Sequence, residues 1–143
     1  MVRLLDANVL IYALNSDAPE HDKVVLWLEL VYSHDSHVLI PVTSAHAFLR
    51  LATNPRAFPK ALSLNHAFKV LKPILHHPKT RCPEPGSEYW RLFERIGTQG
   101  TVIGGRLSDV HFAALALEHG ATLCSTDRHF RRFPELRLEN PLD

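Results

Sequence analysis

Three aspartates that are far apart in the chain fall where the sequence predicts a strand end or a helix start. Asp6 ends the apolar run 1–5, Asp127 follows the apolar segment 121–124, and Asp109 lies in the first turn of a predicted helix. Ligands of parallel sheets bind beyond the carboxyl ends of the strands, so these carboxylates can meet there. Together they would repel unless a cation neutralised them, and oxygen ligands favour Mg²⁺ or Mn²⁺. The aspartates therefore predict a divalent-metal site suited to phosphodiester hydrolysis.

Each aspartate also has an ordinary structural interpretation. Asp6 is a plausible helix N-cap, Asp109 is an acid favoured by the dipole of its helix, and Asp127 is a typical Asx-turn residue. Their position together at the predicted strand ends, without basic neighbours before them, favours the metal site over three separate structural uses.

Two polar residues close to these acids are candidates for supporting them. Asn8 is expected either to hold Asp6 or a metal-bound water, or to cap the first helix. Ser125 is expected either to hydrogen-bond a carboxylate or water, or to form the turn that follows its strand.

Arginines follow the last aspartate directly. Arg128 and Arg131, with Arg132 and interleaved aromatic residues, are candidates for binding a phosphate backbone, and a solvated basic face is the alternative. Net charge supports neither interpretation, because 16 Lys and Arg against 15 Asp and Glu give only +1.

The elements that position these residues alternate along the chain, which predicts an α/β domain with a parallel sheet covered on both faces. The expected strands are 1–5, 37–41, 121–124 and 136–138. The expected helices are 8–14, 21–33, one from a Thr43 or Ser44 cap to Asn54, 61–72, 88–96, and 109–119 after a Ser108 cap. Residues 73–85 are expected to be a loop or short strand, and 97–106 a glycine-rich loop that lacks the Gly-Lys-Ser/Thr of a P-loop.

Length and composition are typical of one globular domain, residues 1–143. The chain is 45% hydrophobic and 22% charged, which excludes a disordered or low-complexity protein. It contains no apolar run long enough to span a membrane. Its only cysteines, Cys82 and Cys124, do not form a disulfide framework and favour a reducing compartment. We therefore expect a cytoplasmic protein without a membrane partner.

Three segments resemble PIN-domain ribonucleases, and more closely VapC-type toxins of toxin–antitoxin pairs. They are LLDANVLIYAL (4–14), SAHAFLRLATNPRAF (44–58) and SDVHFAALALEHGATLCSTDRHFRRFPELRLENPL (108–142). The resemblance implies a three-layer α/β/α domain that is a Mg²⁺- or Mn²⁺-dependent endoribonuclease, with a metal-activated water. It places the catalytic, metal-binding acids at Asp6, Asp109 and Asp127.

The resemblance also implies partners. A toxin requires a cognate antitoxin, and its substrate is expected to be RNA, such as tRNA or rRNA. A homodimer or a toxin–antitoxin hetero-oligomer is expected. The helical segment 24–32, which is apolar on nearly every face, is a candidate docking or dimer surface.

One position departs from the family pattern. The family usually has a Glu just before the FLR segment, where this chain has Ala47. Three carboxylates instead of four make a second ion harder to hold, so we expect at most one tightly bound ion. His46 is a poor substitute because adjacent helical side chains point about 100° apart, whereas Thr43 and Arg50 share the face of Ala47. Arg50 is a candidate for pairing with a carboxylate or for binding RNA.

Two other functions are possible. A catalytically silent PIN-like module that binds RNA or protein would explain the absence of the Glu at Ala47. A phosphoacceptor signalling domain is disfavoured, because the chain has no second acid beside Asp6 and no Lys near Asp127.

Overall fold

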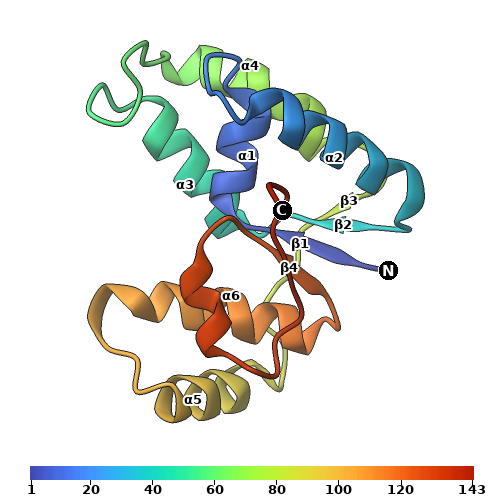
Figure 1. The fold of residues 1–143 in the computed structure, drawn as a ribbon, viewed down its shortest axis with the longest axis vertical. Coiled ribbons are helices and arrows are strands. Elements are labelled where there is room, and N and C mark those ends of the chain that lie inside the picture. Colours follow the sequence, from blue (N-terminus) through green and yellow to red (C-terminus); the bar gives the residue numbers. More distant parts are fainter.

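A five-stranded, fully parallel sheet forms the centre of the protein in a computed structural model that describes residues 1–143. The strand order is β3-β2-β1-β4-β5, with β1 and β4 adjacent in the middle (Figure 1). The strands are β1 (Arg3–Leu5), β2 (Val38–Leu39), β3 (Thr80–Arg81), β4 (Thr122–Cys124) and β5 (Leu138–Glu139). The expected parallel sheet is confirmed, and β3 is the short strand allowed for within 73–85.

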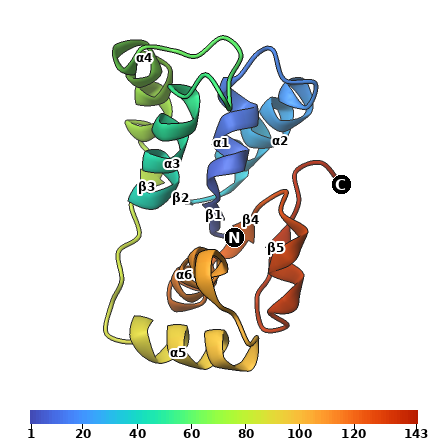
Figure 2. The same ribbon diagram turned by 90° about the vertical axis from the view of Figure 1, so that its left-hand side faces the viewer.

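Helices cover both faces of this sheet. The α-helices are α1 (Ala7–Leu14), α2 (His21–His34), α3 (Val42–Ala52), α4 (Leu64–Leu75), α5 (Tyr89–Gln99) and α6 (Leu107–Glu118), and the 3₁₀ helices are η1 (Gly104–Arg106) and η2 (Arg128–Arg132). Helices α1–α4 lie on one side, and α5 and α6 on the other (Figure 2). This confirms the three-layer α/β/α arrangement.

The side chains of the strands alternate between the two faces of the sheet, and this divides the hydrophobic core into two clusters. Leu5 and Cys124 pack with α1–α4, whereas Leu4 and Leu123 pack with α5 and α6. Because successive side chains of a strand point to opposite faces, strands of two or three residues are long enough to build both cores. The backbone groups that follow β1 and β4 are thereby fixed side by side.

Helix ends were the least accurate part of the sequence prediction. α3 begins at Val42, directly after Pro41, and neither Thr43 nor Ser44 is its cap. Ser44 is instead fully buried, and its hydroxyl donates to the carbonyl of Leu5 at 2.7 Å. The Ser108 cap is also wrong, because Ser108 lies inside α6 and its hydroxyl donates to the carbonyl of Gly105.

Two further helix boundaries differ from the expectation. α4 begins after Ser63, whose hydroxyl accepts from the N–H of His66, and it continues through Pro73 to Leu75. α5 extends to Gln99, into the segment expected to be a glycine-rich loop. The stop of α6 is as expected, since Gly120 has a φ of +63°.

The surface of α2 has an apolar stripe. Leu26 and Leu30 are 63% and 60% exposed, while Val24 and Val31 on the opposite side are buried. None of the helices combines the length and the apolar character needed to cross a membrane.

Candidate active site

Asp6 and Ser125 stand side by side at the carboxyl edge of the sheet. Because β1 and β4 are paired in parallel, the N–H of Asp6 continues the ladder and donates to the carbonyl of Cys124 at 3.0 Å. Ser125, the next residue after β4, then donates from Oγ to Oδ2 of Asp6 at 2.8 Å. Strand pairing therefore fixes the positions of both residues.

The Ser125 hydroxyl also connects Asp6 to the last aspartate. Its Oγ accepts from the N–H of Asp127 at 3.0 Å and from Nδ2 of Asn8 at 3.1 Å. Asn8 Oδ1 in turn accepts from the N–H of Thr126 at 3.2 Å. The interpretation of Asn8 as a helix cap is wrong, because Asp6 is the N-cap of α1. Asn8 instead ties the start of α1 to the turn after β4.

Arg106 brings the other two aspartates together. Its Nη1 donates to Oδ2 of Asp127 at 3.1 Å and to Oδ2 of Asp109 at 3.3 Å. Its Nη2 lies 3.2 Å from Nε2 of His129. One guanidinium nitrogen therefore contacts both carboxylates, so acids from the start of α6 and from the turn after β4 converge.

Sequence reasoning missed Arg106. The expectation that no basic residue precedes the acids is wrong, since Arg106 lies three residues before Asp109 and pairs with it. The i, i+3 spacing, at which helical side chains are neighbours, was the available signal. The prediction of a glycine-rich loop over 97–106 hides this spacing, because loop residues have no helical register.

The carboxyls of the site have different affinities for protons. Burial raises the pKa of Asp6, and the nearby charges of Asp127 and Asp109 raise it further, against hydrogen bonds from Ser125 and Ala7 that lower it. Burial also acts to raise the pKa of Asp127, but hydrogen bonds from His129 and Arg106 hold it below its usual value. Asp6 therefore lies close enough to Asp109 and Asp127 for their charges to affect its pKa.

A cavity of about 570 Å³ opens beside Asp6, between α1, α3 and α6. Ala47 and Arg50 line it, so the position of the missing Glu faces the same space as Asp6. Arg50 forms no ion pair, and its expected pairing with a carboxylate is therefore not present. His111, whose ring lies 3.1 Å from Thr43 Oγ1 and 2.7 Å from the Tyr89 hydroxyl, forms another wall.

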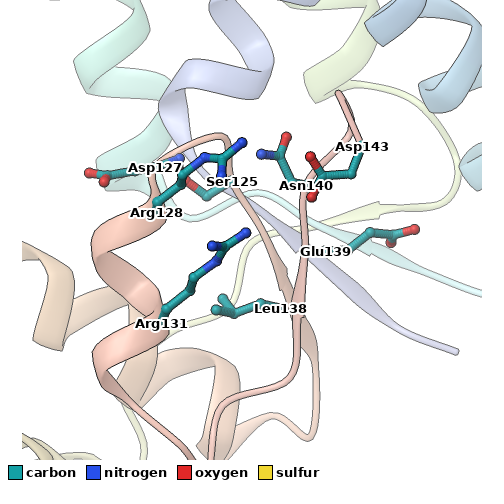
Figure 3. Close-up of a pocket in the computed structure, with 8 residues that line it drawn as sticks. All are labelled: Ser125, Asp127, Arg128, Arg131, Leu138, Glu139, Asn140 and Asp143. Carbon is teal, nitrogen blue, oxygen red and sulfur yellow. Dashed lines mark hydrogen bonds between the residues drawn. The ribbon is translucent and has the colours of Figure 1, made fainter.

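Arg128 and Arg131 line a second, smaller cavity, of about 190 Å³, that shares Ser125 and Asp127 with the acidic site (Figure 3). Arg132, on the same 3₁₀ helix, does not line it and faces a separate pocket beside Phe133. Of the three arginines of η2, Arg128 and Arg131 therefore lie beside the acids, and Arg132 lies away from them.

The three aspartates offer the donor atoms of a divalent-cation site, and Arg106 is bound to two of them. Asp6, Asp109 and Asp127 provide only carboxylate oxygens, which suit Mg²⁺ or Mn²⁺, and a cationic group already lies across two of them. No group of three or more acidic, His or Cys side chains is arranged in this structure to hold a metal ion. The fit is therefore one of donor chemistry, and Arg106 bridges two of the three carboxylates.

The parallel sheet, with acids after β1, after β4 and at the start of α6, is the arrangement expected of the PIN-domain class. The family model described as PIN domain matches residues 3–136. Ribonuclease VapC43 of Mycobacterium tuberculosis is 34% identical over 139 residues, 97% of this chain and 95% of the relative. Ribonuclease VapC31 of the same species is 32% identical over 138 residues, 96% of this chain and 97% of the relative.

Solved structures show the same fold. VapBC2 from Rickettsia felis, bound to a promoter DNA fragment, matches with a TM-score of 0.74 and 21% identity over 98% of both chains. FitAcB from Neisseria gonorrhoeae matches with a TM-score of 0.70 and 20% identity over 99% of both chains. The chain therefore belongs to the PIN-domain family, and within it to the VapC type.

Proposed function

We propose that the chain is a Mg²⁺- or Mn²⁺-dependent endoribonuclease, the toxin of a type II toxin–antitoxin pair. The observation that carries this proposal is the convergence of Asp6, Asp109 and Asp127 at one edge of the sheet. The ribonuclease names of relatives that are 32–34% identical support the reaction class.

Asp6 is the acid already fixed in place. It accepts from Ser125 Oγ, from the N–H of Ala7 at 2.7 Å and from Asn8 Nδ2 at 3.3 Å. Asp109 is nearly buried, at 7% exposure, and therefore has little freedom to leave the site. Arg106 is 44% exposed at its side chain and is the group free to withdraw.

Asp6, Asp109 and Asp127 would hold the divalent ion, whose chemistry would be to lower the pKa of the attacking water and to stabilise negative charge on the phosphate. Ser125 and Asn8 orient Asp6 for that role. Since Ala47 contributes no fourth carboxylate, the chain offers three negative charges, and we propose one tightly bound ion in the free protein.

Cleavage of total tRNA and rRNA, with Mg²⁺ or with chelator, tests the function. We expect the wild type to cleave with Mg²⁺ only, and Asp109→Asn to abolish cleavage because it removes a ligand charge at almost constant shape. Asp17→Asn, which changes an acid that is 64% exposed at its side chain, is the matched control. Cleavage by Asp109→Asn at the wild-type rate would contradict the proposal.

A silent RNA- or protein-binding module is the second candidate. Ala47 and the contacts of Arg106 with Asp109 and Asp127 favour it, because both reduce the charge available to a metal. RNA binding without Mg²⁺-dependent cleavage, measured on the same set of RNAs, would support this candidate over the enzyme.

We also propose a cognate antitoxin as the partner, supported by the similarity to solved VapBC assemblies. The exposed leucines of α2, Leu26 and Leu30, are the surface proposed for it. Leu30→Asp should weaken the association of this chain with its antitoxin, measured by gel filtration of the mixture. The circular dichroism spectrum of the variant should stay unchanged. Unaltered assembly of the folded variant would exclude this surface.

A further inference from the structure

A pocket lies between η2 and the segment that runs from β5 to Asp143. Its volume is about 190 Å³, and Ser125 and Asp127 form the wall that it shares with the acidic site. Arg128 and Arg131 extend into it from η2, and Asn140 and Asp143 lie across from them (Figure 3). The pocket is therefore basic on one side and continuous with the site proposed for cleavage.

The two arginines have no partner in the protein. Neither Arg128 nor Arg131 takes part in any side-chain hydrogen bond or ion pair, although acids line the same pocket. Those acids are directed elsewhere: Glu139 binds Arg3, and Asp127 binds Arg106 and His129. Two guanidinium groups beside a concave surface are thus left without counter-ions, and Asp143 is the single unpaired acid nearby.

Asn140 adds a neutral donor to the pocket. Its Oδ1 accepts from the N–H of Leu142 at 3.0 Å, an Asx turn that fixes the side chain. Its Nδ2 donates to no protein atom and lies on the side of the pocket that faces Arg128 (Figure 3). An amide held in this orientation offers its N–H groups to a ligand.

We propose that this pocket binds a backbone phosphate of the RNA strand, next to the phosphodiester that is cleaved at the site of the aspartates. The identity of the strand as RNA rests on the proposed function. Guanidinium groups bind phosphate oxygens through paired, charge-assisted hydrogen bonds. The wall shared with Asp127 favours a phosphate of the same strand over an acidic group of a protein partner, because the pocket adjoins the site proposed for cleavage. Arg128, Arg131 and Asn140 are the donors.

Fluorescence anisotropy of a labelled ten-nucleotide uridine RNA, in chelator so that cleavage is absent, tests the pocket in the full chain. Arg128→Ala and Arg131→Ala should each weaken binding by roughly fivefold or more. Each should also reduce the slope of log affinity against log salt by about 0.7, the value for one phosphate contact on a single strand. Arg132→Ala, the same change on the same 3₁₀ helix but outside the pocket, is the matched control and should leave both quantities near wild type.

Two near-isosteric variants of the residues opposite the arginines should change the RNA affinity in opposite directions. Asn140→Asp keeps the oxygen that accepts from Leu142 but replaces the donor by a negative charge, so it should weaken RNA binding. Asp143→Asn removes the unpaired acid and should tighten binding. Thermal melting of each variant within about 4 °C of wild type, a shift of roughly 1 kcal/mol or less for a domain of this size, shows that the fold is kept.

The remaining outcomes separate this proposal from the others. If all these variants bound RNA with the wild-type affinity and the wild-type slope of log affinity against log salt, the proposed phosphate site would be overturned. Mg²⁺-dependent cleavage by the same variants would still leave the proposed function intact. Inorganic phosphate at millimolar concentration should compete only weakly with the RNA; tight, Arg131-dependent phosphate binding without any effect on RNA would indicate a site for free phosphate and overturn the proposal. Loss of antitoxin binding with unchanged RNA binding would assign the arginines to the protein partner instead.

Discussion

At the scale of single residues, Arg106 is the cation that contacts two of the three aspartates, Asp109 and Asp127. Its hydrogen bond helps to hold the pKa of Asp127 below the usual value. Asp6 has no cationic partner, and its pKa is raised by burial and by the charges of the other two acids. A divalent ion that binds Asp109 and Asp127 must displace this guanidinium and overcome its repulsion. Under the proposed function, Arg106 would therefore compete with the metal for carboxylate oxygens of Asp109 and Asp127.

Arg106→Ala is expected to bind Mn²⁺ more tightly than wild type, by roughly three- to tenfold, since exposed charge-assisted contacts contribute about 1 kcal/mol. Isothermal titration without RNA measures this directly. Arg106→Lys, which keeps the charge but loses the planar fork, should fall between the two. Equal or weaker Mn²⁺ affinity in Arg106→Ala would mean that Arg106 supports the metal site instead of competing for it.

At the scale of elements, Arg3 joins β1 to β5, which lies beyond β4, and to the end of α2. It pairs with Glu139 of β5 and with Asp35, the C-cap of α2, which is only 2% exposed. Asp35→Ala should lower the free energy of unfolding by about 2–4 kcal/mol, because it removes a buried partner from a charge that stays in place. Urea denaturation measures the loss.

Asp17→Ala is the control for that measurement. Its pair with Lys60 is 3.9 Å long and mostly exposed, so the change should be within about 0.5 kcal/mol of wild type. If Asp35→Ala were as stable as Asp17→Ala, the pair between β1 and α2 would contribute nothing to the fold.

The elements themselves were largely predictable, and their ends were not. Apolar runs identified the neighbourhoods of β1 and β4, and hence Asp6 and Asp127 at the sheet edge, because parallel pairing aligns the carboxyl ends of strands. The local pattern around Ser44 is that of a helix N-cap. Its actual hydrogen bond to the carbonyl of Leu5 depends on the packing of α3 against β1, which a local pattern does not contain. Likewise, the contact of Arg106 with Asp127 spans 21 residues of sequence, and local spacing does not reveal it.

At the scale of the whole molecule, β4 is shielded by helices on both sides. Cys124 at its end is fully buried, and burial raises the pKa of its thiol well above the usual value, whereas Cys82 is exposed. We expect one thiol per chain to react with Ellman's reagent in the native protein and two in denaturant. Cys82→Ser should then show no fast reaction; rapid labelling of Cys124 in that variant would contradict the buried position of β4.

The site likewise depends on the whole fold, since its acids come from the residue after β1, from α6 and from the turn after β4. Titration of the free protein with Mn²⁺, followed by electron paramagnetic resonance, tests this convergence most directly. We predict one tight site per chain in the wild type, weakened at least about tenfold, or 1.4 kcal/mol, in each of Asp6→Asn, Asp109→Asn and Asp127→Asn. Undiminished Mn²⁺ binding in these three variants, or two tight sites in the wild type, would contradict the account.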